Sequence, residues 1–532
     1  MKKIIIPVFL IISSYLSGYS QADIYPVMPG TNLNPDFSVR INDGNGFKEV
    51  PVQDIVDVCF VHFALKGNVQ IEITVAQPIE TYRIGPENLG IVPVVKKNKM
   101  TFELTGPAKA IVLINEGAGN HNTGLDGLCI LADVPEVDAP KLTDPDVINI
   151  AKYNVDPTGN TVETKRIQQI FDDYDGMGKT IYFPPGIYQS GMLHVRNNQS
   201  LYLAPGAVIL GSPDYGDYAR IADEGSGNEK YLLGSWKSNN IKVFGRGIVN
   251  GNGTALRLQD PSGAKFKTHN IQFQGSRNVH IEGIISLDAA SWNMEMIHCD
   301  SVVIKNSKLM SDLRYYEGAM PNTDGIDINK CRHVLVDDCL VWAGDDAITP
   351  KQDRTYENIF PYRDMCGHIY RNIIVYSRKC AVKIGDETMD KEHEIHDMLF
   401  ENFDVVLADR VCCIWSKDGA LIRDITFRDF RIEELYTEYQ SHIHCRINDE
   451  GNSIRDINFV NISAKKPAPK GSSFIGNNLG STINGKRVQY YNIRFSNYTI
   501  GGKKVLDLNG PNANFQLKNS TAGADPTAFS FN

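Results

Sequence analysis

The sequence lacks any broad excess of basic residues, and this absence limits the partners it can bind. Its 532 residues include 54 Lys and Arg against 63 Asp and Glu, which gives a net charge of −9. A protein that binds nucleic acid over a wide surface needs a basic stripe to displace counterions. The composition therefore argues against nucleic acid as a partner. With 42% hydrophobic residues, the chain has enough apolar material for a large folded core.

Apolar runs long enough to cross a membrane are also missing. The one candidate runs from Ile4 to Leu16, follows Lys2 and Lys3, and precedes small and polar residues ending at Ala22. It is too short to span a bilayer comfortably, and its layout is that of a secretory signal. We predict a signal peptide over residues 1–22, cut near Ala22, and hence a secreted or periplasmic protein with no membrane span after signal removal. An uncleaved anchor is the alternative.

Recognisable metal and disulfide motifs are absent too. The ten cysteines follow no disulfide framework, and the sequence has no paired CxxC and no HExxH. Five of them lie within apolar stretches, which favours buried free thiols. These five are Cys299, Cys331, Cys339, Cys380 and Cys412. We expect neither a metal nor an organic cofactor.

The first part of the chain alternates short β-rich runs with turns. Val69–Val75 and Met100–Leu104 are examples, with apolar residues at every second position. This spacing is typical of strands with one buried face. We predict a small antiparallel β-sandwich over residues 23–140, ending in an exposed linker at Val134–Pro140.

A single helix is predicted at the start of the second domain, residues 141–532. It runs from Thr161 to Tyr174, with Thr161 as a cap and an apolar stripe formed by Ile167, Ile170 and Phe171.

Short apolar strands then recur to the end of the chain. Val279–Ile281, Val302–Ile304 and Val334–Val336 begin 23 and 32 residues apart, a loose period close to one coil of a solenoid. A single coil cannot bury its own apolar face, so the coils must stack, with parallel strands about 4.8 Å apart. A propeller or sandwich would show Asn-Gly hairpin turns at regular spacing, and these are sparse. The pattern therefore predicts an all-β stack of parallel coils.

Two segments depart from this pattern of short apolar strands because they are rich in aspartate. They are Asn322–Asn329 and Ala343–Ile348. Asp324 and Asp345 lie 21 residues apart, about one coil, so three or four carboxylates are expected to gather on one face. Crowded carboxylates raise the pKa of one member, which is how a general acid is made. Turn capping by Asp and Asn is one alternative explanation, and a calcium site is another.

Several stretches resemble a known family. They are Tyr153–Gly159, Ile181–Tyr188, Gly247–Gly253, Ser291-Trp292, Asn322–Gly325 and Gly344–Asp346. Over about residues 150 to 500 the sequence resembles glycoside hydrolase family 28, the polygalacturonases. The resemblance implies a right-handed parallel β-helix and hydrolysis with inversion. It implies Asp345 as the general acid, while Asp324 and Asp346 would hold and deprotonate the attacking water.

Inversion sets two geometric expectations. The acid and the base should lie about 6.5 to 9.5 Å apart, to leave room for the water. Adjacent residues on a straight strand point to opposite faces, so Asp345 and Asp346 share a cleft only if the backbone bends, as Gly344 would permit.

The sequence departs from family 28 in the motifs that follow. The family continues with Gly-His-Gly and then Arg-Ile-Lys, which recognises the carboxylate of galacturonic acid. Here Cys380 stands in the place of the histidine, and Cys413 and Trp415 replace the arginine and lysine. His368 is a rival alignment for the histidine. Because a forked cation suits a carboxylate and an aromatic plane suits a sugar face, we predict a neutral sugar at this subsite.

These departures, with the β-sandwich, also resemble glycoside hydrolase family 49, the dextranases and isopullulanases of the same clan. The predicted substrate contacts are Asn322, Asp327, Lys351, His368, Lys383 and Trp415, with Asp386 and Glu387 as further candidates. Trp342 is either a sugar-stacking residue or part of the ladder core. Lys383 and Lys417 either reach an acidic group or lie on a solvated rim.

The predicted function is therefore an inverting glycoside hydrolase that cleaves an α-linked, neutral polysaccharide or oligosaccharide. Three alternatives remain: a polygalacturonase acting on pectin, a Ca-dependent polysaccharide lyase, and a non-catalytic glycan-binding β-helix.

Overall fold

The computed structural model describes most of the chain beyond residue 20. The described residues are 21–55, 58–116, 127–218, 230–259, 268–311, 322–354, 357–436, 440–448, 450–476, 482–483, 486–487, 489–509, 515–517 and 526–532. Apart from Gln21 and Ala22, the predicted signal segment lies outside them.

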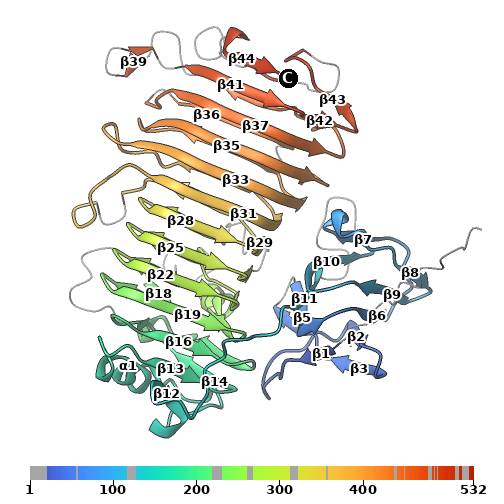
Figure 1. Ribbon diagram of the computed structural model, residues 1–532, viewed down its shortest axis with the longest axis vertical. Helices are drawn as coiled ribbons and strands as arrows, with labels where there is room; N and C mark the ends of the chain where they lie inside the picture. Colours follow the sequence, from blue (N-terminus) through green and yellow to red (C-terminus); the bar gives the residue numbers. More distant parts are fainter. Residues whose placement is uncertain are drawn as a thin grey trace, which may run out of the picture.

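Two β-sheets form the N-terminal domain, as predicted (Figure 1). One sheet contains β1 (Gln21–Ile24), β4 (Gln53–Ile55), β5 (Val58–Lys66), β7 (Tyr82–Gly85), β10 (Ala108–Ile114) and β11 (Gly127–Asp133). The other contains β2 (Phe37–Asn42), β3 (Phe47–Val50), β6 (Val69–Val75), β8 (Val94–Lys96) and β9 (Lys99–Leu104). The expectation of a purely antiparallel sandwich is wrong in one place, because β5 and β11 pair in parallel.

The folded part begins earlier than the predicted signal boundary. Ala22 lies in β1, is 3% exposed, and donates its backbone N–H to Asp43 Oδ2 at 3.0 Å. Ala22, the last residue of the predicted signal segment, is thus part of the sandwich core.

The rest of the chain is a tall stack of parallel coils (Figure 1). Its larger sheet contains β12 (Val147–Asn149), β13 (Thr180–Phe183), β14 (Gly186–Ser190), β16 (Ser200–Leu203), β17 (Ala207–Gly211), β19 (Asn239–Gly245), β20 (Ile248–Asn250), β22 (Arg277–Glu282), β23 (Ile285–Leu287), β25 (Asp300–Lys305), β26 (Lys308–Met310), β28 (Arg332–Asp337), β29 (Leu340–Ala343), β31 (Cys366–Ser377), β33 (Glu394–Leu407), β35 (Leu421–Ile432), β37 (Ile454–Ala464), β41 (Tyr490–Ser496), β42 (Thr499–Ile500), β43 (Lys503–Lys504) and β44 (Phe529–Phe531).

A second sheet of the stack has ten strands and carries the acidic segments. It contains β15 (Leu193–His194), β18 (Lys230–Trp236), β21 (Thr268–Gln274), β24 (Met294–Ile297), β27 (Ile326–Asn329), β30 (Ile348–Lys351), β32 (Cys380–Asp386), β34 (Arg410–Ser416), β36 (Ser441–Ile447) and β38 (Ser473–Ile475). A short hairpin joins β39 (Thr482–Ile483) to β40 (Lys486–Arg487).

The predicted stacking of parallel coils is confirmed by the strand register. Val279 lies opposite Val302, and Val302 lies opposite Val334, so the loose period is one coil. Inside the stack, aromatic rings continue the ladders, with Phe400 and Phe427 stacked at a centroid distance of 5.1 Å. This burial of apolar side chains between coils holds the stack together.

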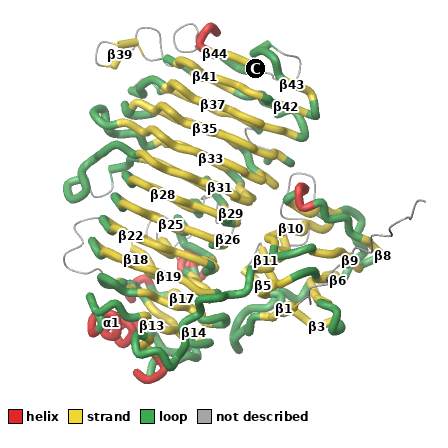
Figure 2. The backbone as a smooth tube through the Cα atoms, in the orientation of Figure 1, coloured by secondary structure: helices red, strands yellow, loops and turns green. Residues whose placement is uncertain are grey.

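Helices occupy little of the described chain (Figure 2). The helix α1 (Thr164–Asp173) buries the predicted stripe, but its N-cap residue is Glu163 rather than Thr161. A second helix, α2 (Gly253–Gln259), was not predicted, because it is short and begins in a glycine-rich stretch. Short 3-10 turns cover Glu87–Leu89, Ile150–Tyr153, Tyr215–Asp217 and Pro526–Ala528. No helix among the described residues is long and apolar enough to cross a membrane.

The N-terminal domain packs against one face of the stack (Figure 1). Phe60, Ile111 and Leu131 of the sandwich share an apolar cluster with Ile285 and Leu340 of the coils. The two domains are therefore joined by a common core, and the sandwich braces the stack.

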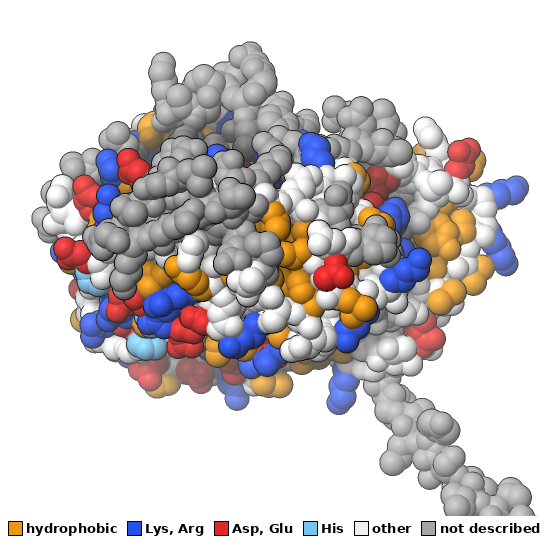
Figure 3. Space-filling model, turned by 90° about the horizontal axis from the view of Figure 1, so that it is seen from above, with side chains coloured by type: hydrophobic (Ala, Val, Ile, Leu, Met, Phe, Trp, Pro, Cys, Tyr) orange, Lys and Arg blue, Asp and Glu red, His pale blue; other side chains and the backbone are white. Residues whose placement is uncertain are grey.

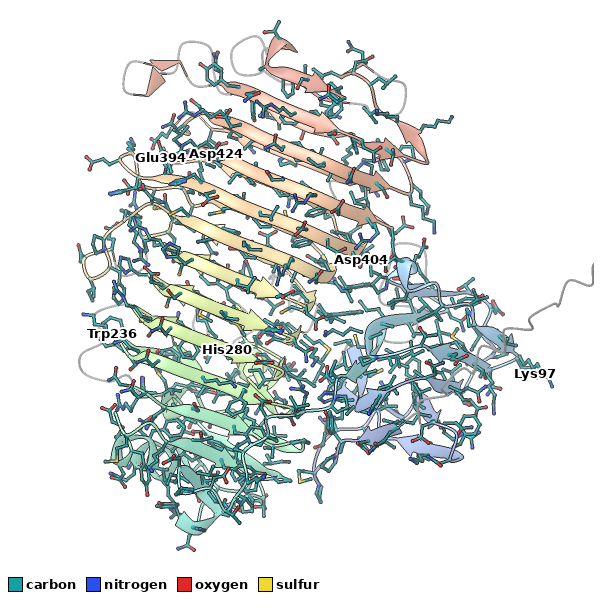
Figure 4. All side chains as sticks on the ribbon, in the orientation of Figure 1. Lys97, Trp236, His280, Glu394, Asp404 and Asp424 are labelled. Carbon is teal, nitrogen blue, oxygen red and sulfur yellow. The ribbon has the colours of Figure 1, made fainter. Side chains whose placement is uncertain are left out.

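Buried charges cross the same interface. Asp133, at the end of β11, accepts from Lys308 Nζ at 2.6 Å and lies 2.8 Å from His62 Nε2. Arg246 Nε lies 3.2 Å from the same carboxylate. Further up the interface, Asn88 donates to Asp404, which faces the sandwich (Figure 4).

The cysteine prediction is confirmed. All ten cysteines are free, and all except Cys366 are buried. On the surface seen from above, basic and acidic side chains are interspersed over the described part (Figure 3).

Candidate active site

The three predicted aspartates meet at one corner of the stack. Asp324 lies just before β27, and the pair Asp345 and Asp346 lies in a bend between β29 and β30. The strands β27 and β30 are hydrogen-bonded in parallel, with Ile326 opposite Ile348. The predicted one-coil separation and the predicted bend are both confirmed.

The acids are close together and almost closed off from solvent. One carboxylate oxygen from each of Asp324, Asp345 and Asp346 lies within 4.8 Å of the others. Their exposed fractions are 5%, 7% and 3%. The expected separation of about 6.5 to 9.5 Å is not found between these oxygens. Side chains on neighbouring coils that point the same way keep the strand spacing of about 4.8 Å.

Turn capping does not account for these aspartates. Asn and Asp residues where the long strands change direction adopt positive φ. Asn372 in β31 and Asn402 in β33 do so at 58°, and Asn402 donates to Asn372 across coils. None of Asp324, Asp345 and Asp346 has a positive φ. Their carboxylates crowd together instead of capping a turn of this kind.

Asp346 is held in its ionised form. Lys383 Nζ donates to Asp346 Oδ2 at 2.9 Å, and the backbone N–H of Cys380 donates to Oδ1 at 2.9 Å. Burial acts to raise the pKa of Asp346, but Lys383, Arg410 and a hydrogen bond with the Cys380 side chain outweigh it and lower the pKa to about 2.

Asp345, in contrast, tends to keep its proton, because its pKa is raised. Burial and the adjacent negative charge of Asp346 raise the pKa of Asp345 to about 7. Asn322 Nδ2 donates to Asp345 Oδ2 at 3.2 Å, and Ser377 Oγ donates to the Asp345 carbonyl at 2.6 Å. A carboxyl that keeps its proton near neutral pH beside an ionised one can act as an acid.

Asp324 is supported by a second charged pair. Burial, with the charges of Asp327 and Asp345, raises the pKa of Asp324. Asp327 itself pairs with Lys351 at 2.7 Å, and Lys351 Nζ lies 3.5 Å from the centroid of the Trp292 ring. Asp327 and Lys351, two of the predicted substrate contacts, are buried and form an ion pair. Their contact with substrate stays a prediction.

Trp415 lies on the same sheet face, two coils beyond the aspartate pair. It is half-buried in β34, and its Nε1 donates to Asn448 Oδ1 at 3.3 Å. The Arg446 guanidinium lies 4.9 Å from the centroid of its ring. The position suits a sugar-stacking surface, and this role stays a prediction.

His368 and Trp342, both considered as sugar contacts from the sequence, are buried. His368 is 1% exposed, and its neighbours in register, Val334 and Met398, are core residues, so its side chain points into the stack. Trp342 is 2% exposed and packs between the two domains, against Gly127 and Tyr376. Sequence alone could not separate these faces, because alternation does not tell which outward face a second domain covers.

The remaining candidates form an ion network at the rim. Asp386 pairs with Lys383 at 2.6 Å and with Lys417 at 3.6 Å. Glu387 contributes negative charge near Lys351. Lys383 and Lys417 therefore both form ion pairs with carboxylates.

Arg410 and Ser377 were not predicted. Arg410 is 8% exposed and opposite Cys380 in the register of β32 and β34, which places its charge near Asp346. Ser377 supports the bend through the Asp345 carbonyl. The only signal in the sequence is their position, with Ser377 one coil and Arg410 two coils after the aspartate pair.

Replacing Lys383 tests the electrostatics of the pair. Wild-type cleavage should fall as pH rises through about 7, because Asp345 loses its proton, and at low pH, because Asp346 gains one near pH 2. In Lys383→Met, the low-pH limb should move up by roughly 1–3 pH units, because a cation that lowers the pKa of Asp346 is gone. Lys383→Arg should keep the wild-type profile. A pH–kcat/KM profile with an unmoved acid limb in Lys383→Met would contradict this assignment.

Fold and site together define a class: a parallel β-helix protein with a trio of buried carboxylates on one sheet face. Residues 219–478 match the model of glycosyl hydrolases family 28. The match contains all three aspartates, and it confirms the resemblance predicted from the sequence.

Known proteins with similar sequences carry names of the same family. A probable polygalacturonase of Vitis vinifera is 25% identical over 210 residues, which cover 36% of this chain and 42% of that protein. An exo-poly-alpha-D-galacturonosidase of Dickeya chrysanthemi is 31% identical over 121 residues, 20% of each chain. The chain thus spans less than half the length of these relatives.

Among solved structures, Dex49A from Penicillium minioluteum superposes with a TM-score of 0.51 at 14% identity, covering 96% of each chain. This likeness concerns the fold, a right-handed parallel β-helix with an N-terminal β-domain. It confirms the predicted family 49 resemblance in architecture.

Proposed function

We propose that this protein is an exported glycoside hydrolase that cleaves an α-linked polysaccharide or oligosaccharide with inversion. The observation that carries the proposal is the cluster of three buried carboxylates, with one oxygen of each within 4.8 Å of the others. Within it the pKa of Asp345 is raised to about 7 and that of Asp346 is lowered to about 2, which divides their roles.

The chemistry follows from this division. Asp345 protonates the leaving glycosidic oxygen, and its buried site favours the neutral acid before the reaction. Asp346, with Asp324, orients a water and accepts its proton as the water attacks the anomeric carbon. Lys383 and Arg410 keep Asp346 negative, so it can take that role.

For the sugar at the subsite beyond the acids, we propose a neutral ring. Cys380 and Cys413 stand where family 28 has a histidine and an arginine, and Trp415 offers an aromatic plane. Lys383 is paired with Asp346, and Lys417 with Asp386.

A second candidate, a polygalacturonase, is favoured by one residue. Arg446 lies over Trp415, and no ion pair to it is found among the described residues. A guanidinium on the aromatic plane could receive a uronate carboxylate. The relatives named polygalacturonases agree with this candidate.

Product analysis separates the candidates. Purified protein is incubated with dextran, pullulan, neutral galactan and polygalacturonate, and reducing ends are counted while NMR follows the anomeric protons. We expect release from a neutral α-glycan with a product of inverted configuration. Release from polygalacturonate alone would support the second candidate. Retained configuration, or an unsaturated product absorbing near 235 nm, would contradict inverting hydrolysis.

Chelation provides a further prediction. The three carboxylates are close enough to hold a divalent cation. Because acid–base cleavage by these residues needs no metal, we expect activity in excess EDTA to equal that of the untreated protein. Loss of activity in EDTA that returns with Ca²⁺ would favour the lyase alternative.

A further inference from the structure

Trp342 connects the N-terminal domain to the bend that carries the aspartate pair. We name Ala343–Asp346 the catalytic bend. The Trp342 ring stacks on Tyr376 at a centroid distance of 3.8 Å with 4° between the planes. On the side of the sandwich the ring meets Gly127, the first residue of β11, where a Cβ would lie only 2.3 Å from the Trp342 Cη2. The ring is therefore fixed from both domains.

One hydrogen-bonded route leads from this ring to the proposed acid. Trp342 is opposite Tyr376, and Ala343 is opposite Ser377, in the ladder of β29 and β31. Ser377 Oγ then donates to the Asp345 carbonyl at 2.6 Å. A shift of the ring would move this ladder end and the carboxyl that it supports.

A second route leads from the same residue to Asp324. The Trp342 carbonyl accepts from the Ser311 N–H at 3.0 Å, and Ser311 Oγ accepts from Asn293 Nδ2 at 3.1 Å. The Asn293 N–H donates to the Asp324 carbonyl at 2.8 Å. Trp342 is thus linked to both coils that supply the trio.

We propose that the N-terminal domain positions the catalytic bend through Gly127 and Trp342, which makes both of them positioning residues. The proposal rests on the proposed function. Trp342 touches no substrate, because it is buried at the domain interface. It acts by fixing the acid relative to the bond that breaks, and a displacement of about 1 Å is enough to cost roughly 100-fold in rate.

Two glycine variants make a matched test. In Gly127→Ala the added methyl group pushes the Trp342 ring. In the control, Gly85→Ala, the methyl group meets Val406 at 2.7 Å, at the same interface but two coils further along. Both substitutions crowd the interface, so both should lower the melting temperature. We expect kcat to fall roughly 10- to 100-fold in Gly127→Ala only, with KM nearly unchanged.

A second change in the same pair provides rescue. Trp342→Phe removes the ring atoms that the new methyl group meets, so Gly127→Ala with Trp342→Phe should recover most of the lost kcat. Hydrogen exchange gives a readout that needs no substrate: amides of Ala343–Ile348 should lose protection in Gly127→Ala and keep it in Gly85→Ala.

The outcomes are distinguishable. Equal effects of the two glycine variants on kcat or on exchange in the bend would overturn the positioning role. Failure of the wild-type protein to cleave any glycan would refute the proposed function alone, and hydrogen exchange would still decide whether the sandwich holds the bend.

Discussion

Asp345→Asn is expected to lower kcat by roughly 10²- to 10⁴-fold, the usual contribution of a general acid. The amide keeps the size of the side chain but carries no transferable proton. Asn322 can still bond to the amide oxygen, so the bend should keep its shape. Initial rates of reducing-end release, measured on the substrate identified by the panel, provide the test, with melting temperature as the check on folding.

Asp424→Asn is the control for this variant. Asp424 lies in β35, on the far side of the stack from the sandwich (Figure 4), and has φ 53°, which Asn tolerates. Its kcat should match that of the wild type. Cleavage at the wild-type rate by Asp345→Asn would remove Asp345 from the mechanism and point to Asp324 as the acid.

Asp133→Asn should destabilise the protein by about 3–5 kcal/mol, because Lys308 and Arg246 would be left buried without their shared carboxylate. Burial opposes ionisation of Asp133, but Lys308 and the other cations hold its pKa below the usual range. The wild-type contribution is therefore present above about pH 4 and is lost on acidification, whereas the variant lacks it at every pH. Urea unfolding followed by tryptophan fluorescence measures the difference, since Trp342 reports on this interface.

The control is an ion pair in water. Lys466 and Glu434 are paired at the surface, with side chains 62% and 36% exposed. Glu434→Gln should change stability by about 0–1 kcal/mol. A loss of similar size in both variants would show that the cluster at Asp133 does not hold the domains together.

The spacing of apolar residues was enough to predict the stack. Val279, Val302 and Val334 recur about once per coil, and a coil with an unburied apolar face has no stable alternative to stacking. The same spacing placed Asp324 one coil from Asp345. Local chemistry was also sufficient for the bend, because two adjacent aspartates cannot share one cleft on a straight strand.

The sequence did not predict the contacts between segments that lie far apart along the chain. The ion pair of Lys383 with Asp346 and the charge of Arg410 near Asp346 were not predicted, because these residues are far apart along the chain. The sequence also did not place His368 inside the stack, because a register that puts a polar residue inside a coil looks the same as one that puts it outside.

The sequence by itself determined that this chain stacks coils and gathers three aspartates, because periodicity and spacing are local properties. The family resemblance singled out Asp345 as the acid, and only the tertiary structure gave the physical reason, because burial and neighbouring charges set each pKa. The tertiary structure also decided the place of Trp342, which depends on a second domain whose contacts leave no period in the sequence. The spacing of the aspartates is visible along the chain, whereas the charges around each of them come from packing.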